Sequence, residues 1–182
     1  MSAAAGCTGI MAGQVAKLAG CKVIGICGTD EKGEVIRSQY GFDGSINYKT
    51  QDVQEQIAKL CPEGVDVYFD NVGGPTLDAA IPNMALFGRI AVCGLITNYI
   101  SETAVPGPTG FDQVLMKRLR IEGFFSPDFY HRGPDIDQTL KKWTEAGQLK
   151  LPFDVVTGLE NTVTAYSKLF TGANIGKVVV EL

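Results

Sequence analysis

The sequence predicts an α/β fold built on a doubly wound parallel sheet with helices on both faces. Short apolar runs alternate with helical segments at the spacing of β–α–β units over the first half of the chain. Several of these runs are apolar along their whole length, as expected for strands buried on both sides. Glycine or polar residues follow the runs and mark the turns into the next helix.

Local patterns define the elements of the first half. Residues 9–19 predict a helix whose small residues allow close packing, and residues 22–27 predict a buried, β-branched strand. Residues 30–40 predict a helix that Gly41 ends. The other predicted elements are strands at 45–47, 65–69 and 89–93, a helix at 52–60, and a helix at 75–84 that Pro75 opens and Pro82 disturbs.

The second half is less regular. Residues 96–110 predict a loop rich in proline and glycine, and residues 120–125 predict an alternating strand, typical of a sheet edge or a subunit contact. The remaining predictions are a short helix at 111–119, a polar loop at 126–134, an amphipathic helix at 135–146, a strand at 154–157, a helix at 161–170 with Asn161 as its cap, and a strand at 177–181.

Composition excludes several classes of protein. The net charge of −4 argues against a nucleic-acid partner, and the apolar runs are far shorter than a membrane span. One histidine rules out a multi-histidine metal site, so no metal is predicted. The five cysteines are scattered without a C-x-x-C pair, and the first residues lack the pattern of a signal peptide. These features indicate a cytoplasmic protein.

The most informative segment is glycine-rich and leads into the first helix. Gly6, Cys7, Thr8 and Gly9 give the pattern Ala4-x-Gly6-x-x-Gly9, a variant of the dinucleotide fingerprint with alanine in first place. Free N–H groups at a helix N-terminus bind anions, and missing side chains let a pyrophosphate approach the backbone. The alternative is a glycine-rich turn without a ligand. The fingerprint favours a Rossmann-type fold.

The next strand favours NADP over NAD. An NAD site needs a carboxylate about 20 residues after the glycines, on the ribose 2′-hydroxyl. Here Gly28 occupies that place, and Thr29 and Lys32 suit a 2′-phosphate. Asp30 and Glu31 weaken this electrostatic argument, and Asp30 offers an alternative role as the helix cap.

Two further loops belong at the same site. Residues 70–74 and 93–99 follow predicted strands, and ligands of open α/β sheets bind at the carboxyl ends of strands. The alternative for Asn71 and the glycine pair after it is a simple turn.

Several segments together resemble one family. AAAGCTG, GTDEK, GFDGSINYKT, VDVYFDNVGG, GRIAVCGLITNY and NIGK, in this order, look like the medium-chain dehydrogenase/reductase superfamily. Within it they resemble the zinc-free prostaglandin reductase and alkenal double-bond reductase group, including curcumin-reductase-like members. The resemblance runs over nearly the whole chain.

The resemblance implies NADPH-dependent reduction of the C=C bond of an α,β-unsaturated ketone or aldehyde. It places Gly6, Cys7, Thr8 and Gly9 on the pyrophosphate and Lys32 and Tyr48 beside the 2′-phosphate. Tyr99 is the expected catalytic residue, since a neutral hydroxyl can stabilise developing oxyanion charge. The remaining expected cofactor contacts are Asn71, Cys93, Gly94, Leu95, Ile96, Tyr99, Phe124, Phe125, Ser126 and Asn174.

The family's chain is longer and begins with a substrate domain. We therefore expect residues 1–150 to form an NADP-binding Rossmann domain, truncated in its first strand to Ser2, Ala3 and Ala4. Residues 151–182 are expected to belong with the missing domain. The strand around Val179 would then lack its usual partner, and would pack on the domain's flank, pair with another chain or be poorly ordered.

Other functions stay open at this point. A quinone-reductase-like enzyme or a non-catalytic NADP-binding module fits the same cofactor domain. A zinc alcohol dehydrogenase is disfavoured, because no cysteine cluster or histidine-rich site is present. Arg37 and His131 are read as a solvated helix charge and a loop residue. The strand from Arg120 to Phe125 predicts a homodimer contact.

Overall fold

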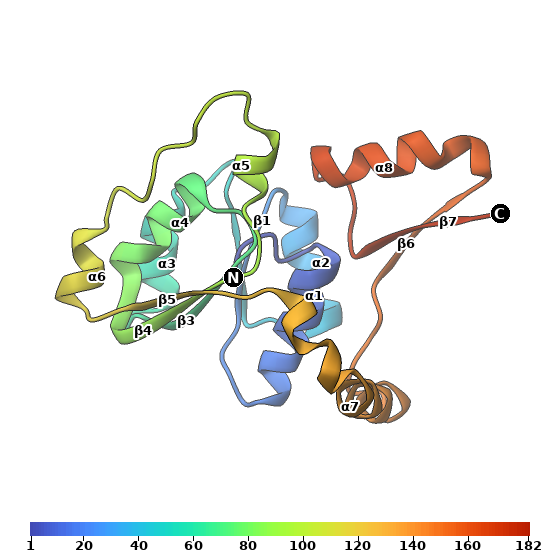
Figure 1. Cartoon of the computed structure of the whole chain (residues 1–182), viewed down its shortest axis with the longest axis horizontal. Helices are drawn as coiled ribbons and strands as arrows, with labels where there is room; N and C mark the ends of the chain where they lie inside the picture. The colour runs from blue at the N-terminus through green and yellow to red at the C-terminus, as the bar shows by residue number, and fades with distance from the viewer.

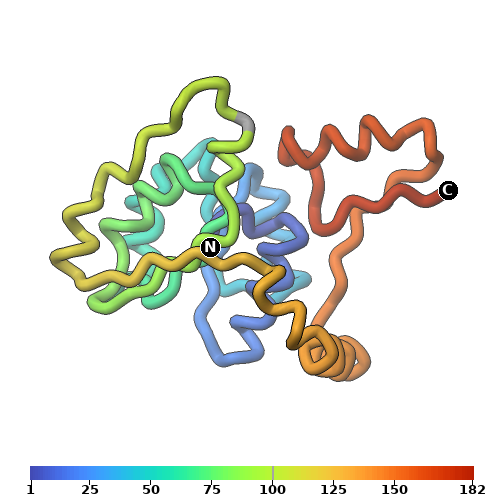
Figure 2. Tube along the Cα trace, in the orientation of Figure 1, coloured from blue at the N-terminus to red at the C-terminus, as the bar shows by residue number. Residues whose placement is uncertain are grey.

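The computed structural model describes residues 1–99 and 101–182 and, of residue 100, only its place in a helix (Figure 2). The chain folds around a twisted parallel sheet, and its last segment forms a smaller lobe beside this main body (Figure 1). Among the described residues, no helix has the length and apolar character that a bilayer crossing requires.

The strands of the main body are all parallel. β1 (Ile24–Cys27) pairs with β2 (Gly44–Asn47). A second group has β4 (Met84–Val92) at its centre, between β3 (Val65–Asp70) and the edge strand β5 (Arg120–Gly123).

Residues 1–4 join these two groups of strands. Ser2 N donates to Phe69 O of β3 at 3.1 Å, while Ala4 N donates to Ile26 O of β1 at 2.9 Å. Ile26 N returns a bond to Met1 O at 2.9 Å. The spatial order is therefore β2, β1, residues 1–4, β3, β4, β5, the order of a Rossmann-type sheet. The predicted fold class is confirmed, with the first strand reduced to this short segment.

Helices cover both faces of the sheet, as a doubly wound fold requires. α1 (Cys7–Leu18) and α2 (Asp30–Tyr40) bury Ile10 and Ile36 in one apolar cluster. α3 (Val53–Leu60) and α4 (Gly74–Ala80) bury Ile57 and Leu77 in the other. On β1, Ile26 belongs to the second cluster and Cys27 to the first, because successive side chains of a strand point to opposite faces. Each buried Ile or Leu contributes about 1.5–3 kcal/mol.

The ends of α2 show how local sequence fixes an element. The helix ends at Gly41, whose φ of 73° is the left-handed conformation predicted for a terminating glycine. Its cap is Thr29, whose hydroxyl accepts from Lys32 N at 3.2 Å. The interpretation of Asp30 as the cap is therefore wrong, because the Asp30 carboxylate accepts instead from Asn47 Nδ2 at 2.9 Å.

Three elements differ from the prediction for reasons of tertiary context. β4 begins at Met84 rather than at residue 89, because the register against β3 shifts between Val65 and Val67 and accommodates extra residues. The helix predicted over 75–84 stops at Ala80 and continues as a 3-10 turn, Ile81–Asn83, that contains Pro82. A short helix, α5 (Ile96–Ile100), lies within the predicted loop.

In the second half, the chain completes the main sheet with β5 and then leads through further helices to the smaller lobe. α6 (Asp112–Met116) leads into β5, and a 3-10 helix (Ser126–Arg132) leads into α7 (Gly133–Glu145). The buried Gln14 side chain then binds the backbone of Lys150 twice, donating to its O at 3.0 Å and accepting from its N at 2.8 Å. These bonds fix the chain against α1 before it enters the smaller lobe.

The smaller lobe is a β–α–β unit of its own. β6 (Phe153–Thr157) pairs in parallel with β7 (Lys177–Glu181), and α8 (Thr162–Thr171) connects them. None of the three arrangements expected for the strand around Val179 foresaw its observed pairing within the chain, where Val179 pairs with Val155. Asn161 occupies the predicted N-cap position of α8, but its side chain makes no capping bond, since its amide donates to Thr157 O at 2.8 Å.

The contact between α1 and the loop after α2 gives a test of the fold. A Cβ added at Gly13 would lie 2.1 Å from the ring of Phe42, which is buried. We expect Gly13→Ala to lower the free energy of unfolding by about 1–3 kcal/mol, because overpacking outweighs alanine's better helix propensity. Chemical denaturation measures this change.

Gly133→Ala is the matched control. Gly133 is also helical, and an added Cβ meets nothing within 4 Å. Its free energy of unfolding should be unchanged or raised by up to about 1 kcal/mol. Equal effects at the two positions would contradict the packing role of Gly13.

Candidate functional site

The predicted site residues lie mainly in the segments that follow the carboxyl ends of the parallel strands. Thr29 and Lys32 follow β1, Tyr48 follows β2, and Asn71 follows β3. The segments containing Tyr99 and Phe124 follow β4 and β5. Because these strands are parallel, their ends meet at one edge of the sheet, where the N-terminus of α1 also begins.

The N-terminus of α1 is built to accept an anion. The first helical bond runs from Ile10 N to Gly6 O at 2.9 Å, so the N–H groups of Cys7, Thr8 and Gly9 precede it. Gly6 has no side chain to cap the helix, and no acidic residue lies in the first turn. A Cβ at Gly9 would lie 2.4 Å from Ala3 O, so only glycine allows this close approach to the first strand. The helix dipole adds partial positive charge here.

Lys32 is held by the smaller lobe. Its ammonium donates to Gly172 O and, at 2.7 Å, to Asn174 O, both in the turn between α8 and β7. Partial burial lowers the pKa of Lys32, and the nearby Lys49 cation adds to the effect. Sequence reasoning assigned Lys32 to a phosphate without foreseeing these carbonyl partners, because they are about 140 residues away.

Tyr48 lies across the end of β1. Its backbone N donates to Cys27 O at 3.0 Å, and a Cβ added at Gly28 would lie 3.1 Å from the Tyr48 hydroxyl. The tyrosine ring therefore lies over the turn that carries Thr29, with 52% of the residue exposed. Thr29, Lys32 and Tyr48 thus lie around the start of α2. Their contact with a 2′-phosphate stays a prediction.

A polar hollow of about 190 Å³ lies beside this corner. Arg37 lines this hollow, and its guanidinium already has two partners. It donates to Ser45 Oγ at 2.8 Å and forms an ion pair with Glu34 at 2.6 Å. This pairing agrees with the interpretation of Arg37 as a helix-surface charge. The hollow is lined by Cys27, Thr29, Asp30, Arg37, Ser45, Asn47 and Gln51.

The loops after β3 and β4 pack directly against each other. Asn71 O accepts from Ile96 N at 3.4 Å, and Val72 O accepts from Thr97 N at 3.2 Å. A Cβ at Gly94 would lie 3.4 Å from Asn71 O, an ordinary contact distance, so Gly94 lies beside the backbone of Asn71. Burial raises the pKa of the Cys93 thiol, which therefore stays neutral at pH 7.

Tyr99 and Phe125 are widely exposed. Tyr99 lies in α5 with 71% of its surface exposed, and Phe125 follows β5 with 67% exposed. Phe124 N donates to Val92 O at 2.9 Å, which continues the β4–β5 ladder, and its ring stacks on Phe129 at a centroid distance of 4.9 Å. Phe129 was not among the predicted site residues.

Asn174 lies on the glycine-loop side of the site. Its carbonyl accepts from Lys32, and its amide donates to Gly176 O at 2.8 Å. Gly176 N in turn donates to Ala5 O at 2.8 Å, next to the glycine loop. A contact of Asn174 with a nicotinamide, together with Phe124, Phe125 and Ser126, stays a prediction.

Sequence reasoning missed one buried pair, Asp70 and Ser2. Both are fully buried, and Ser2 Oγ donates to Asp70 Oδ1 at 2.8 Å. The sequence signal for Asp70 is an acidic residue at the end of an apolar strand. Ser2 gave no such signal, because its partner lies 68 residues away.

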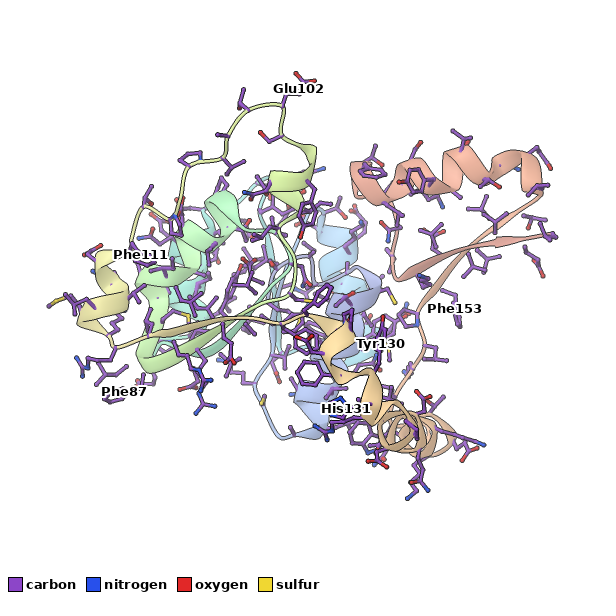
Figure 3. The ribbon with its side chains drawn as sticks, viewed as in Figure 1. Phe87, Glu102, Phe111, Tyr130, His131 and Phe153 are labelled. Atoms are coloured by element: carbon purple, nitrogen blue, oxygen red, sulfur yellow. The ribbon has the colours of Figure 1, made fainter. Side chains whose placement is uncertain are left out.

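The single histidine lies in the 3-10 helix before α7, the helix that follows the Phe124 segment. Figure 3 shows His131 and Tyr130 beside α7, and His131 is exposed. Within the described residues, no group of three or more His, Cys, Asp or Glu side chains is placed to hold a metal ion.

Comparison with known proteins places these features in a family. The model of the family described as "Zinc-binding dehydrogenase" matches residues 7–141. The chain is 44% identical over 181 residues to a 2-alkenal reductase (NADP(+)-dependent) of Nicotiana tabacum, covering 99% of this chain and 52% of the relative. It is 40% identical to prostaglandin reductase 1 of Bos taurus, covering 100% of this chain and 55% of the relative.

The solved structures agree with the fold. The crystal structure of CurA from Vibrio vulnificus in complex with NADPH superposes with a TM-score of 0.91 at 39% identity, covering 99% of this chain and 55% of that chain. The chain thus spans about half the length of the relatives it matches. On the matched residues and the superposed fold, the chain belongs to the zinc-binding dehydrogenase family of the medium-chain dehydrogenase/reductase superfamily.

Proposed function

We propose that this chain forms the cofactor-binding portion of an NADPH-dependent reductase acting on the C=C bond of α,β-unsaturated ketones or aldehydes. The observation that carries the proposal is the uncapped N-terminus of α1 together with Thr29, Lys32 and Tyr48 at the neighbouring strand ends. The printed names of the relatives, an NADP-dependent alkenal reductase and a prostaglandin reductase, support the same chemistry.

The residues present fit NADPH. The N–H groups of Cys7, Thr8 and Gly9 would hold the pyrophosphate, because they precede the first helical bond and the helix dipole favours an anion. Lys32 and Tyr48 would hold the 2′-phosphate, and no carboxylate occupies the place after β1 that an NAD site uses on the ribose. The loops at Asn71 and at 93–96 would line the other half of the cofactor.

In the proposed reaction, bound NADPH supplies a hydride to the β-carbon of the enone. The chain's own contribution is to stabilise the charge that then develops on the carbonyl oxygen. Tyr99 suits this role because a phenol donates a hydrogen bond while staying neutral near pH 7. The Cys93 thiol is neutral and the Leu95 side chain is apolar, so the loop before Tyr99 adds no charge there.

Zinc has no place in this proposal. The family's name mentions zinc, but the described residues do not fit a zinc site, since they include one histidine and no metal-binding cluster. The proposed reaction therefore takes no step through a metal.

We further propose how the protein assembles and where in the cell it is found. β5 is the edge of the main sheet, and all of its residues are exposed, which supports a homodimer through residues 120–125. The lobe at 151–182 belongs, in this proposal, with a substrate domain, because its large apolar side chains Phe153, Val163 and Tyr166 are exposed. The free cysteines of the described chain support a cytoplasmic setting.

Lys32 provides the test of cofactor choice. Lys32→Ala should weaken NADPH binding by about 10–100-fold, because one charge-assisted hydrogen bond to the 2′-phosphate contributes about 1.5–3 kcal/mol. NADH binding should change less than threefold or so, since NADH has no 2′-phosphate. Titration of nicotinamide fluorescence measures both affinities.

Lys59→Ala is the control for net charge. Lys59 is exposed in the last turn of α3 and lies outside the site. It should leave the preference for NADPH unchanged. If the unchanged chain binds NADH as tightly as NADPH, or binds neither, the proposed cofactor role is wrong.

Tyr99 provides the test of the chemistry. In the full-length protein, Tyr99→Phe should lower kcat for an enone by about 100-fold, in the range found when one oxyanion donor is removed, while NADPH affinity changes little. The measurement is steady-state oxidation of NADPH with an enone and, separately, a quinone. A quinone turned over faster than any enone would favour the quinone-reductase alternative, and wild-type activity of the variant would remove Tyr99 from the mechanism.

A further inference from the structure

A carboxylate is buried at the end of β3 and, within the described residues, forms no ion pair with a cationic side chain. This residue, Asp70, has no exposed surface. Burial of an unpaired charge is costly unless hydrogen bonds compensate for the lost water. The donors around Asp70 therefore indicate what the residue holds in place.

These donors belong mainly to the loop that follows the strand. Asp70 Oδ1 accepts from Val72 N at 3.1 Å and from Gly73 N at 3.2 Å, and Oδ2 accepts from Gly73 N at 3.1 Å. Gly73 has a φ of 70° and a ψ of −157°, a conformation open essentially to glycine. The carboxylate thus holds the loop in an unusual backbone conformation.

The same residue also fixes the loop after β4. The backbone O of Asp70 accepts from Cys93 N at 2.8 Å and from Gly94 N at 3.1 Å. A Cβ added at Gly73 would lie 2.9 Å from Leu95 Cδ2, so the two loops are packed without spare room. A shift of Gly73 would therefore displace Leu95.

Ser2 completes the arrangement from the first strand. Its hydroxyl donates to Asp70 Oδ1 and accepts from Asn71 N, both at 2.8 Å. The amide of Asn71 donates back to Ser2 O at 2.9 Å. The position of Asn71 is thus determined by Ser2 and Asp70 together.

We infer that Asp70 is a positioning residue for the nicotinamide half of the cofactor site, acting through the loops at 71–74 and 93–96 without touching the cofactor. The inference rests on the proposed function, which places those loops along that half of NADPH. It assigns Asp70 no contact with the adenosine half, where Thr29, Lys32 and Tyr48 lie beyond β1.

The test compares a whole cofactor with its adenosine half. In Asp70→Asn, an amide N–H₂ replaces one acceptor oxygen and opposes Gly73 N in either orientation, because Gly73 N donates to both oxygens. We expect NADPH binding to weaken about tenfold, which corresponds to about 1.4 kcal/mol. Binding of 2′,5′-ADP should stay within about twofold of the unchanged chain, and calorimetric titration gives both values.

Two further variants sharpen the comparison. Ser2→Ala removes one donor to Asp70 and the acceptor of Asn71 N, and should weaken NADPH binding in the same direction by about threefold. Asp66→Asn changes an exposed carboxylate of the same strand and should leave both ligands unaffected. Asp66 therefore controls for loss of charge on β3.

Amide exchange in the ligand-free protein tests the geometry without the cofactor. In Asp70→Asn the amides of Val72 and Gly73 should exchange faster, while Ile26 N, which donates to Met1 O at 2.9 Å, should not change. Equal weakening of both ligands would show a general structural role, and unchanged NADPH binding would show no positioning role. Either result overturns the inference. If the unchanged chain binds neither 2′,5′-ADP nor NADPH, the proposed function fails. In that case the exchange measurement still tests Asp70, because an unaltered exchange rate at Gly73 in Asp70→Asn would overturn its role.

Discussion

The main sheet depends on the backbone hydrogen bonds of its first four residues. Without Met1 to Ala4, β1 and β2 would share no ladder with β3, β4 and β5, and backbone groups at the centre of the sheet would lose their partners. Buried backbone groups are costly when unpaired, by about 1–3 kcal/mol each. The same residues form the surface on which the turn into α1 lies, because Ala3 O and Ala4 Cα leave no room for a side chain at Gly9.

Glycine serves two separate purposes in this chain. At Gly9 and Gly13 the backbone is helical, and glycine is needed because a neighbouring atom occupies the space of a Cβ. At Gly41 and Gly73 the φ is positive, and glycine is needed for the conformation. The first kind brings α1 onto the sheet, and the second kind ends a helix or shapes a loop at the site. Glycine is abundant here because close packing and site geometry both require it.

Elements set by neighbouring residues were predictable from the sequence. Asp30–Tyr40 and Lys177–Glu181 have the predicted bounds, because a capping segment, a terminating glycine and a β-branched run are local signals. The early start of β4 was not predictable, since it depends on a register shift against β3 and on Phe87, whose positive φ of 61° is accompanied by the guanidinium of Arg118 at 4.9 Å from its ring. The pairing of β7 with β6 was not predictable, because strand pairing depends on tertiary contacts that local sequence does not encode.

In the candidate site, too, features set by local sequence were predictable and features set by tertiary contacts were not. Parallel strands bring their carboxyl ends to one edge, so residue types at those ends were enough to predict which loops meet. The partners of Lys32 were not predictable, because carbonyl groups carry no sequence signal. An ammonium has three N–H donors, and Gly172 O and Asn174 O take two of them. Among the described residues, the third donor has no recorded acceptor, and the two carbonyls restrict where the cation can lie. The turn between α8 and β7 thus restrains a long, flexible lysine side chain although it lies far away in the sequence. Under the proposed function, this restraint places the ammonium for a phosphate.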